Sequence, residues 1–168
     1  MSSTPAAGSF RDLLAHFPTG VVAITALSAG QPVGLAAGSF FSVSLEPPLI
    51  GFGVAHTSTS WPHIAAAPGF AVSILAADQA HISKILATPG PAKFSNVDWR
   101  LSPGGSPIIS GAVAYLDCAH HGSHPAGDHE LIIGRVLRYD TLQGGAPLVF
   151  HRRDYWSTGE QPVTARPV

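Results

Sequence analysis

The chain has 168 residues, a length that suits one domain with a single hydrophobic core. Apolar residues make up 45% of it and Asp, Glu, Lys and Arg only 11%, so its surface offers few charges to water and a buried subunit interface is expected. Nine basic and ten acidic residues nearly cancel, and no basic cluster exceeds Arg152-Arg153, which argues against nucleic acid as a partner.

The compartment is inferred from the single cysteine and the N-terminal residues. Because Cys118 is the single cysteine, the chain cannot form an internal disulfide, which suits a reducing environment. Cys118 itself is expected to be a small, half-buried strand residue. The first ten residues have neither a basic nor an apolar leader region, and no stretch is long and apolar enough for a membrane span. We therefore expect a cytoplasmic protein without a membrane partner.

The first half of the chain predicts one helix and four strands. An apolar stripe within Ser9–Phe17 predicts a short amphipathic helix that ends at Pro18. Residues 21–27 and 33–40 are expected to form a hairpin around a turn at 28–32. Residues 42–45 and 49–54 are expected to be two further strands, separated by Glu46-Pro47-Pro48.

The second half begins with a hydroxyl-rich loop at 56–60 and a helical segment at 61–67. Residues 70–75 are expected to be a strand, and Asp78 is expected to cap a helix whose Ile82, Ile85 and Leu86 face inward. The turn-rich stretch 88–107 is predicted to be a long loop, a type that is often functional. Long strands at 112–121 and 130–142 are expected to be joined through 122–128, and a loosely held tail of residues 157–168 to follow Trp156.

These elements predict a mainly β domain. About seven strands carry two or three short helices between hairpins, without the strict strand–helix alternation of a parallel sheet. A closed antiparallel barrel is therefore the expected architecture, with a sandwich as the alternative.

Two stretches suggest ligand binding, and each also has a simpler interpretation. Thr57 to Ser60 place four hydroxyls directly before a helix, which suits a phosphate but is more simply explained by helix capping through Thr59 or Ser60. Ala36 to Ser44 combine small residues with hydroxyls, which would let a flat ring approach the backbone or would simply form a tight strand pair. Gly51-Phe52-Gly53 lacks the third glycine of a dinucleotide fingerprint, so a Rossmann-type site is excluded.

Four histidines, His120, His121, His124 and His129, lie within ten residues. A zinc site is disfavoured because no thiol or carboxylate stands at a matching spacing, and we interpret them as solvated loop histidines. His129 is set apart because Gly127-Asp128 turns the chain directly before it, although Asp128 also suits an ordinary turn.

The chain resembles the short-chain flavin reductases, the small components of two-component flavin-dependent monooxygenases. The resemblance covers residues 9–156, which we therefore expect to be the flavin reductase-like domain. It is carried most specifically by Ser42-Val43-Ser44-Leu45-Glu46-Pro47-Pro48 and by Gly127-Asp128-His129. Further matching segments are Phe10 to Val22, Ser58-Thr59-Ser60, Phe70 to Leu75, Lys93-Phe94, and Pro147 to His151 with Tyr155.

This resemblance implies an antiparallel six-stranded split β-barrel, a homodimer and a flavin groove at the dimer interface. It places Ala37, Gly38, Ser39 and Ser42 beside the flavin ring and ribityl chain, and Ser58, Thr59 and Ser60 at the phosphate. Lys93 and Phe94 would close the site, His129 would face the nicotinamide, and Tyr155 would lie near the cofactor. The His-rich segment 120–124 departs from the family pattern, which leaves the nicotinamide side of the groove open.

The implied activity is transfer of hydride from NADH or NADPH to FMN or FAD, with reduced flavin supplied to a partner monooxygenase. Such chemistry needs no acid–base pair, because the cofactors carry the reactivity and the protein orients them. The alternative is a flavin-binding split barrel without turnover, and Gly127-Asp128-His129 favours the enzyme.

Overall fold

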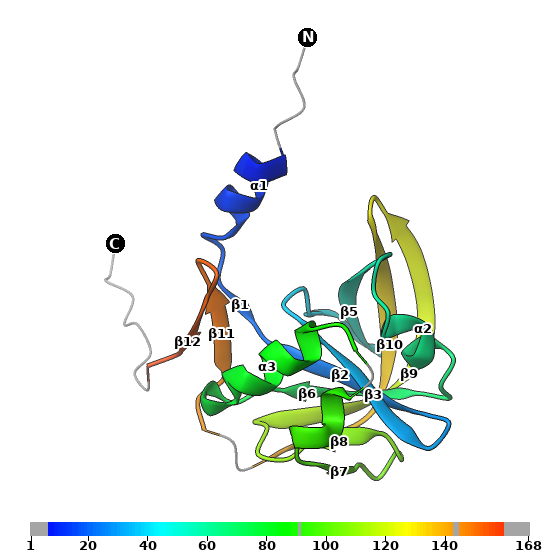
Figure 1. The fold of residues 1–168 in the computed structure, drawn as a ribbon. Helices are drawn as coiled ribbons and strands as arrows, with labels where there is room; N and C mark the ends of the chain where they lie inside the picture. Colours follow the sequence, from blue (N-terminus) through cyan, green and yellow to red (C-terminus); the bar gives the residue numbers. More distant parts are fainter. Residues whose placement is uncertain (1–6, 91, 143–144, 160–168) are drawn as a thin grey trace.

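A seven-stranded sheet dominates the computed structural model, which describes residues 7–90, 92–142 and 145–159 (Figure 1). Every neighbouring pair in this sheet is antiparallel, in the order β3-β2-β6-β9-β10-β5-β4. The expected mainly β, antiparallel fold is confirmed, with seven strands in the main sheet instead of six. The strands are β2 (Val22–Ser28), β3 (Gln31–Ala37), β4 (Phe41–Leu45), β5 (Pro48–Ala55), β6 (Phe70–Ile74), β9 (Ala114–Ala126) and β10 (His129–Thr141).

The sheet has to curl because its two edge strands are neighbours in sequence. Residues 38–40 alone separate β3 from β4, so the strand ends lie at most about 15 Å apart along the chain. Across a flat sheet of seven strands the same edges would be about 29 Å apart. Among the described residues β3 pairs with β2 alone and β4 with β5 alone, so the barrel is split at these edges. The closed barrel expected from the strand pattern is thus corrected.

The two hairpin turns are tighter than the sequence suggests. Ala29 and Gly30 both have positive φ (49° and 77°) and form a two-residue turn, so β2 and β3 extend into the stretch expected to be a loop. The β9–β10 hairpin turns at Gly127-Asp128, so the expected connector at 122–128 is mostly strand. Pro125 is tolerated there because β6 pairs with β9 only as far as Cys118 and leaves the outer edge of β9 free.

The helices are short and peripheral. They are α1 (Ala7–Leu14), which stands away from the sheet in Figure 1, α2 (Trp61–Ala65), α3 (Ala80–Ala87), and the 3₁₀ turns η1 (Ala77–Gln79) and η2 (Lys93–Asn96). Asp78 was expected to cap α3, but it lies inside η1, and the Gln79 side chain instead accepts the Ala76 N–H at 3.0 Å. No helix in the described part of the chain has the length and apolar character to span a membrane.

Two smaller sheets complete the fold. One contains β1 (Thr19–Gly20), β11 (Leu148–His151) and β12 (Asp154–Ser157), and the other contains β7 (Trp99–Leu101) and β8 (Pro107–Ile109). The predicted long loop 88–107 therefore holds η2 and most of a hairpin. The expected tail begins within β12, and residues 160–168 lie outside the described part.

The core covers both faces of the sheet, because alternate residues of β2 belong to different buried clusters, Ile24 to one and Ala23 to the other. Ile24, Phe52 and Phe70 are fully buried, and the Phe52 and Phe70 rings meet edge to face with centroids 5.8 Å apart. Cys118 is buried rather than half-buried, and burial, with the Asp117 charge as a smaller cause, raises the pKa of its thiol to about 12. The thiol is therefore a neutral packing group.

Asp117 attaches the β7–β8 hairpin to the main sheet. This buried carboxylate on β9 accepts hydrogen bonds from the Ser102 hydroxyl and from the Gly104 N–H at 2.9 Å. Both donors lie in the loop between β7 and β8. The carboxylate thus fixes the hairpin that carries Trp99.

Replacing Asp117 with Ala is expected to lower the free energy of unfolding by about 1.5–3 kcal/mol, because it leaves a buried hydroxyl and an N–H without their charged acceptor. The exposed Asp98 provides the matched control, and Asp98→Ala is expected to change stability by less than about 0.5 kcal/mol. Urea denaturation of both variants measures the difference, and equal stability would contradict the anchoring role.

Candidate functional site

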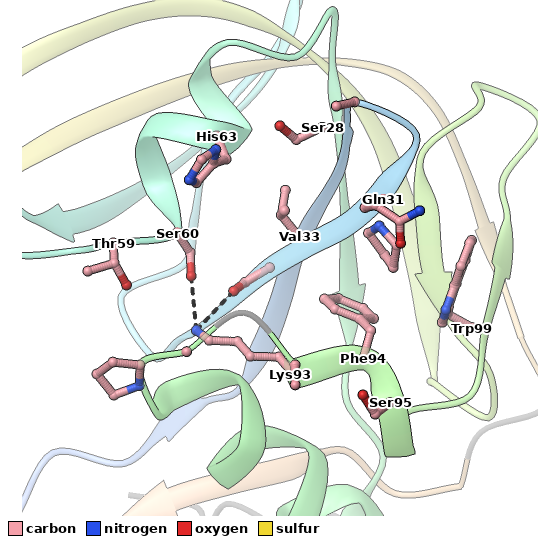
Figure 2. A pocket seen from close by; sticks show the side chains of 16 residues that line it. Ser28, Gln31, Val33, Thr59, Ser60, His63, Lys93, Phe94, Ser95 and Trp99 are labelled. Atoms are coloured by element: carbon pink, nitrogen blue, oxygen red, sulfur yellow. Dashed lines mark hydrogen bonds between the residues drawn. The ribbon is translucent and has the colours of Figure 1, made fainter.

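A cavity of about 960 Å³ opens beside the edge strand β3 (Figure 2). Its walls come from the β2–β3 hairpin, the start of α2, and residues of the segments 89–90 and 92–99. Four of the residues singled out from the sequence line it, namely Thr59, Ser60, Lys93 and Phe94. The fold therefore brings together the hydroxyl loop and the Lys93-Phe94 pair, which are more than thirty residues apart in sequence.

The ammonium of Lys93 is the principal charge of this cavity. Its Nζ donates to the Ser60 hydroxyl at 2.9 Å, to the Leu86 carbonyl at 2.7 Å and to the Gly34 carbonyl at 3.3 Å. Three neutral acceptors hold the group in place, and no carboxylate pairs with it within the described ranges. Burial lowers the pKa of Lys93 from its ordinary value, so an anion would relieve an uncompensated positive charge.

Within the hydroxyl loop, residues 57–60, one hydroxyl caps α2 and another faces the cavity. Ser58 Oγ accepts the Trp61 N–H at 3.2 Å and so caps the first turn of α2. Ser60 occupies the N-cap position but makes no cap bond, and its hydroxyl is turned to Lys93 instead. Capping by Thr59 or Ser60 was therefore the wrong simple interpretation, since Ser58 caps and leaves Thr59 and Ser60 at the cavity.

A second group of predicted residues meets on the outer face of β5. The Ser39 hydroxyl accepts the Gly53 N–H at 2.9 Å and donates to the Gly53 carbonyl at 3.1 Å. A Cβ placed on Gly53 would lie 3.6 Å from Ser39 Oγ and 3.8 Å from His129 Cδ2. The missing side chain of Gly53 thus leaves a small open space between Ser39 and His129.

His129 begins β10 opposite Ala55 and is half exposed, with 48% of its side chain accessible. Its Nδ1 lies 2.7 Å from Asp128 Oδ1, and this hydrogen bond is the main cause that lowers the pKa of Asp128. An ionised carboxylate can only accept, so Nδ1 carries the hydrogen and Nε2 is the atom presented to a ligand. The turn before His129 therefore sets its tautomer.

A short stretch of chain, residues 55–60, connects the Ser39–His129 group on β5 with the Ser60–Lys93 group at the cavity. The His56 N–H donates to the Asp128 carbonyl at 3.0 Å, which holds the start of the hydroxyl loop against the β9–β10 turn. From Ala55, the strand partner of His129, five residues lead to Ser60 on the cavity, a span of at most about 17 Å. One extended ligand can therefore reach both groups.

The remaining predicted residues lie outside the cavity wall. The side chain of Ala37 is buried in the core. Gly38 is packed so closely on Thr19 that a Cβ on Gly38 would lie 2.9 Å from Thr19 Oγ1. Ser42 is exposed on β4. The Tyr155 hydroxyl is engaged at 2.9 Å by Ser83 of α3, and its ring packs on Phe150.

The histidines before His129 lie in a strand and not in a loop, whereas their expected exposure to solvent is confirmed. The His120 ring packs against Phe70 with centroids 5.1 Å apart, and its Nε2 donates to the Ala67 carbonyl at 3.2 Å. His121 is exposed at a bulge of β9, and His124 is exposed opposite Leu131 of β10. Within the described ranges no three side chains of the metal-ligating types come together.

Sequence reasoning missed most of the cavity wall, including Gln31, His63 and Trp99. These three come from the start of β3, from α2 and from β7, and each stands in an ordinary local pattern. Only the tertiary fold brings them together, so no local signal identifies them.

Comparison with known proteins gives a consistent family assignment. Residues 14–159 match the model of the flavin reductase like domain. A flavin reductase of Pseudomonas putida is 44% identical over 87% of this chain and 86% of its own length. The reductase subunit HsaB of a flavin-dependent monooxygenase from Rhodococcus jostii is 41% identical over 91% of this chain and 77% of its own. The NADH-dependent FMN reductase SmoA of Agrobacterium fabrum is 40% identical over 84% and 80%.

Solved structures agree with this result. Nitrilotriacetate monooxygenase component B from Mycobacterium thermoresistibile superposes with a TM-score of 0.87 at 39% identity, covering 95% of this chain and 92% of its own. The NADH:FAD oxidoreductase SgcE6 of Streptomyces globisporus, solved in complex with NAD and FAD fragments, has a TM-score of 0.85 at 32% identity and covers 95% and 98%.

Proposed function

The chain belongs to the flavin reductase like family of oxidoreductases, and from this premise we propose that it transfers hydride from NADH or NADPH to a flavin and supplies the reduced flavin to a partner monooxygenase. The observation that carries the proposal is the Lys93 ammonium, which is held by Ser60 beside an open cavity and lacks a carboxylate partner in the described part of the chain. A flavin phosphate supplies the missing negative charge.

The residues present suit a flavin phosphate and ring. The Thr59 and Ser60 hydroxyls flank Lys93 and add neutral donors for phosphate oxygens. Gly53, beside Ser39, has no side chain to keep the edge of a flat ring away from the backbone. Ala37, Gly38 and Ser42 would approach the ring mainly through backbone and hydroxyl groups, while Ser58 and Phe94 shape the phosphate loop and Tyr155 braces α3.

The bound flavin supplies the hydride acceptor, and the protein supplies orientation. His129 is proposed to meet the nicotinamide carboxamide through Nε2, because Asp128 occupies Nδ1. An acceptor at that position pairs with the amide N–H₂ of a nicotinamide and fixes which face of the ring is presented.

The function is tested by mixing the purified protein with FMN or FAD and NADH under anaerobic conditions. Loss of flavin absorbance near 450 nm at a protein-dependent rate is the expected result. Flavin that binds without being reduced by NADH or NADPH would instead identify a flavin-binding protein without turnover, and no binding of either flavin would overturn the proposal.

Replacing Lys93 with Met is expected to weaken FMN binding about ten- to hundredfold and to leave riboflavin, which lacks the phosphate, nearly unaffected. In the native protein the advantage of FMN over riboflavin is expected to fall as the pH rises through the lowered pKa of Lys93. Lys84→Met, at an exposed position on α3, is the matched control. Fluorescence titrations measure both ligands, and an equal loss for both would remove Lys93 from the phosphate site.

Replacing His129 with Ala is expected to raise the KM for NAD(P)H or to slow flavin reduction while flavin affinity changes little, because the two ligands use different groups. His121→Ala, at an exposed position of the same hairpin, controls for the loss of an imidazole. Stopped-flow reduction with flavin affinity measured separately distinguishes the outcomes. A rate whose dependence on NAD(P)H concentration is unchanged would refute the role of His129.

We also propose a homodimer, because large apolar side chains are exposed on α1 and on the edge strand β4. Leu13 is 67% and Phe17, just after α1, 71% exposed, and Leu45 of β4 is 90% exposed. Surfaces of this kind mark protein interfaces. Light scattering at micromolar concentration is expected to report twice the chain mass, and a monomer would count against a flavin groove shared by two subunits.

A further inference from the structure

We propose that His124 is a second contact residue for the nicotinamide dinucleotide, whose pyrophosphate it binds while His129 meets the nicotinamide. This inference rests on the proposed function. It is carried by the register of the sheet, which brings these two histidines of the β9–β10 hairpin to one face.

His124 and His129 stand in neighbouring rows of cross-strand pairs. His129 is paired with Ala126 of β9, and His124 stands two residues before Ala126, opposite Leu131. Paired residues share a face, and so do residues two apart along a strand. Both imidazoles therefore belong to the face of Gly53, whose Cβ would lie 3.8 Å from His129 Cδ2. Diagonal positions of this kind are about 7–8 Å apart, so one dinucleotide can contact both histidines.

Two directions across this face are closed to the dinucleotide. Along β5 the floor ends at Gly51, where a Cβ would lie 2.6 Å from the Phe41 ring. Toward β4 the Ser39 hydroxyl is bonded to the backbone of Gly53. A third direction, along residues 55–60, is the one proposed for the flavin on its way to the phosphate site.

The side toward β9 is open. β6 pairs with β9 only as far as Cys118, so the outer part of the β9–β10 hairpin has a free edge, and it projects from the rest of the sheet in Figure 1. His124 is exposed on this part, and no ion pair within the described ranges engages its ring. A dinucleotide whose nicotinamide meets His129 can therefore extend over His124.

The charges of the hairpin give His124 its role. The Asp128 side chain is 94% exposed at the turn and repels a pyrophosphate there. Glu130 belongs to the opposite face, where its carboxylate accepts the Ser123 hydroxyl at 2.9 Å. His124 offers an N–H donor to phosphate oxygens whether its imidazole is neutral or protonated. It thus provides a favourable contact on the dinucleotide face, one strand away from the turn.

The first experiment separates the two halves of the dinucleotide. NADH carries the pyrophosphate, whereas 1-benzyl-1,4-dihydronicotinamide donates hydride from the same ring without any phosphate. His124→Ala is expected to raise the KM for NADH about three- to tenfold and to leave the benzyl analogue within about twofold. His121→Ala, which removes an exposed imidazole from the bulge of β9, is the matched control and is expected to change neither.

Equilibrium binding gives a second readout that does not depend on turnover. Calorimetric titration of NAD⁺ into the flavin-saturated protein is expected to show about three- to tenfold weaker binding for His124→Ala. His124→Lys, which restores a donor and a positive charge, is expected to recover the native affinity. Binding of NAD⁺ by His124→Lys that is as weak as that of His124→Ala would overturn the inference.

Equal affinities of the native protein and His124→Ala for NAD⁺ would also overturn the inference and leave the proposed function standing. The same holds for equal losses with NADH and with the benzyl analogue, because His124 would then act on the nicotinamide or on the shape of the hairpin. A native protein that reduces flavin with neither donor would overturn the proposed function, and this inference with it.

Discussion

The three-residue link between β3 and β4 is the constraint on which the rest of the structure depends. It joins the two edges of a seven-stranded sheet, so the sheet must curl until these edges approach, while the hydrogen bonds between them stay unmade. Gly38 and Ser39 lie in the link itself, and the Ser39 hydroxyl, just before β4, bonds the backbone of Gly53 on the neighbouring strand β5. Two of the residues proposed to bind the ligand, Gly38 and Ser39, therefore lie at the split that prevents closure.

The candidate site holds its ammonium and its imidazole through hydrogen bonds within the protein. Lys93 is positioned by a hydroxyl and two carbonyls, and His129 by the carboxylate of its own turn. These partners orient the ammonium and the imidazole before any ligand arrives, so binding energy is not consumed in arranging them. Such a site suits chemistry in which the protein orients two reactive cofactors and contributes no acid or base.

Local sequence predicted those features that local physics determines. Apolar alternation identified the strands of the main sheet, and four hydroxyls before a helix identified the loop that carries Ser60. The connector at 122–128 was misjudged because glycine and proline usually mark turns, whereas a free strand edge removes the cost of Pro125. The sequence could not identify three other residues of the cavity wall, Gln31, His63 and Trp99, because they become neighbours only after the sheet has curled.

The strand order also determines when, along the growing chain, the barrel can form. The hairpins β2–β3 and β4–β5 are complete early in the chain. The second partner of β5 is β10, so Gly51 can pair with Ile133 only after β10 has been synthesised. Until the last third of the chain has been made, β5 keeps one edge unpaired. The β9–β10 hairpin then pairs with β6 on one side and with β5 on the other, and so joins the two halves of the sheet. Pairings so distant in sequence slow folding and expose strand edges during synthesis. The same topology that creates the split thus makes completion of the main sheet depend on the β9–β10 hairpin.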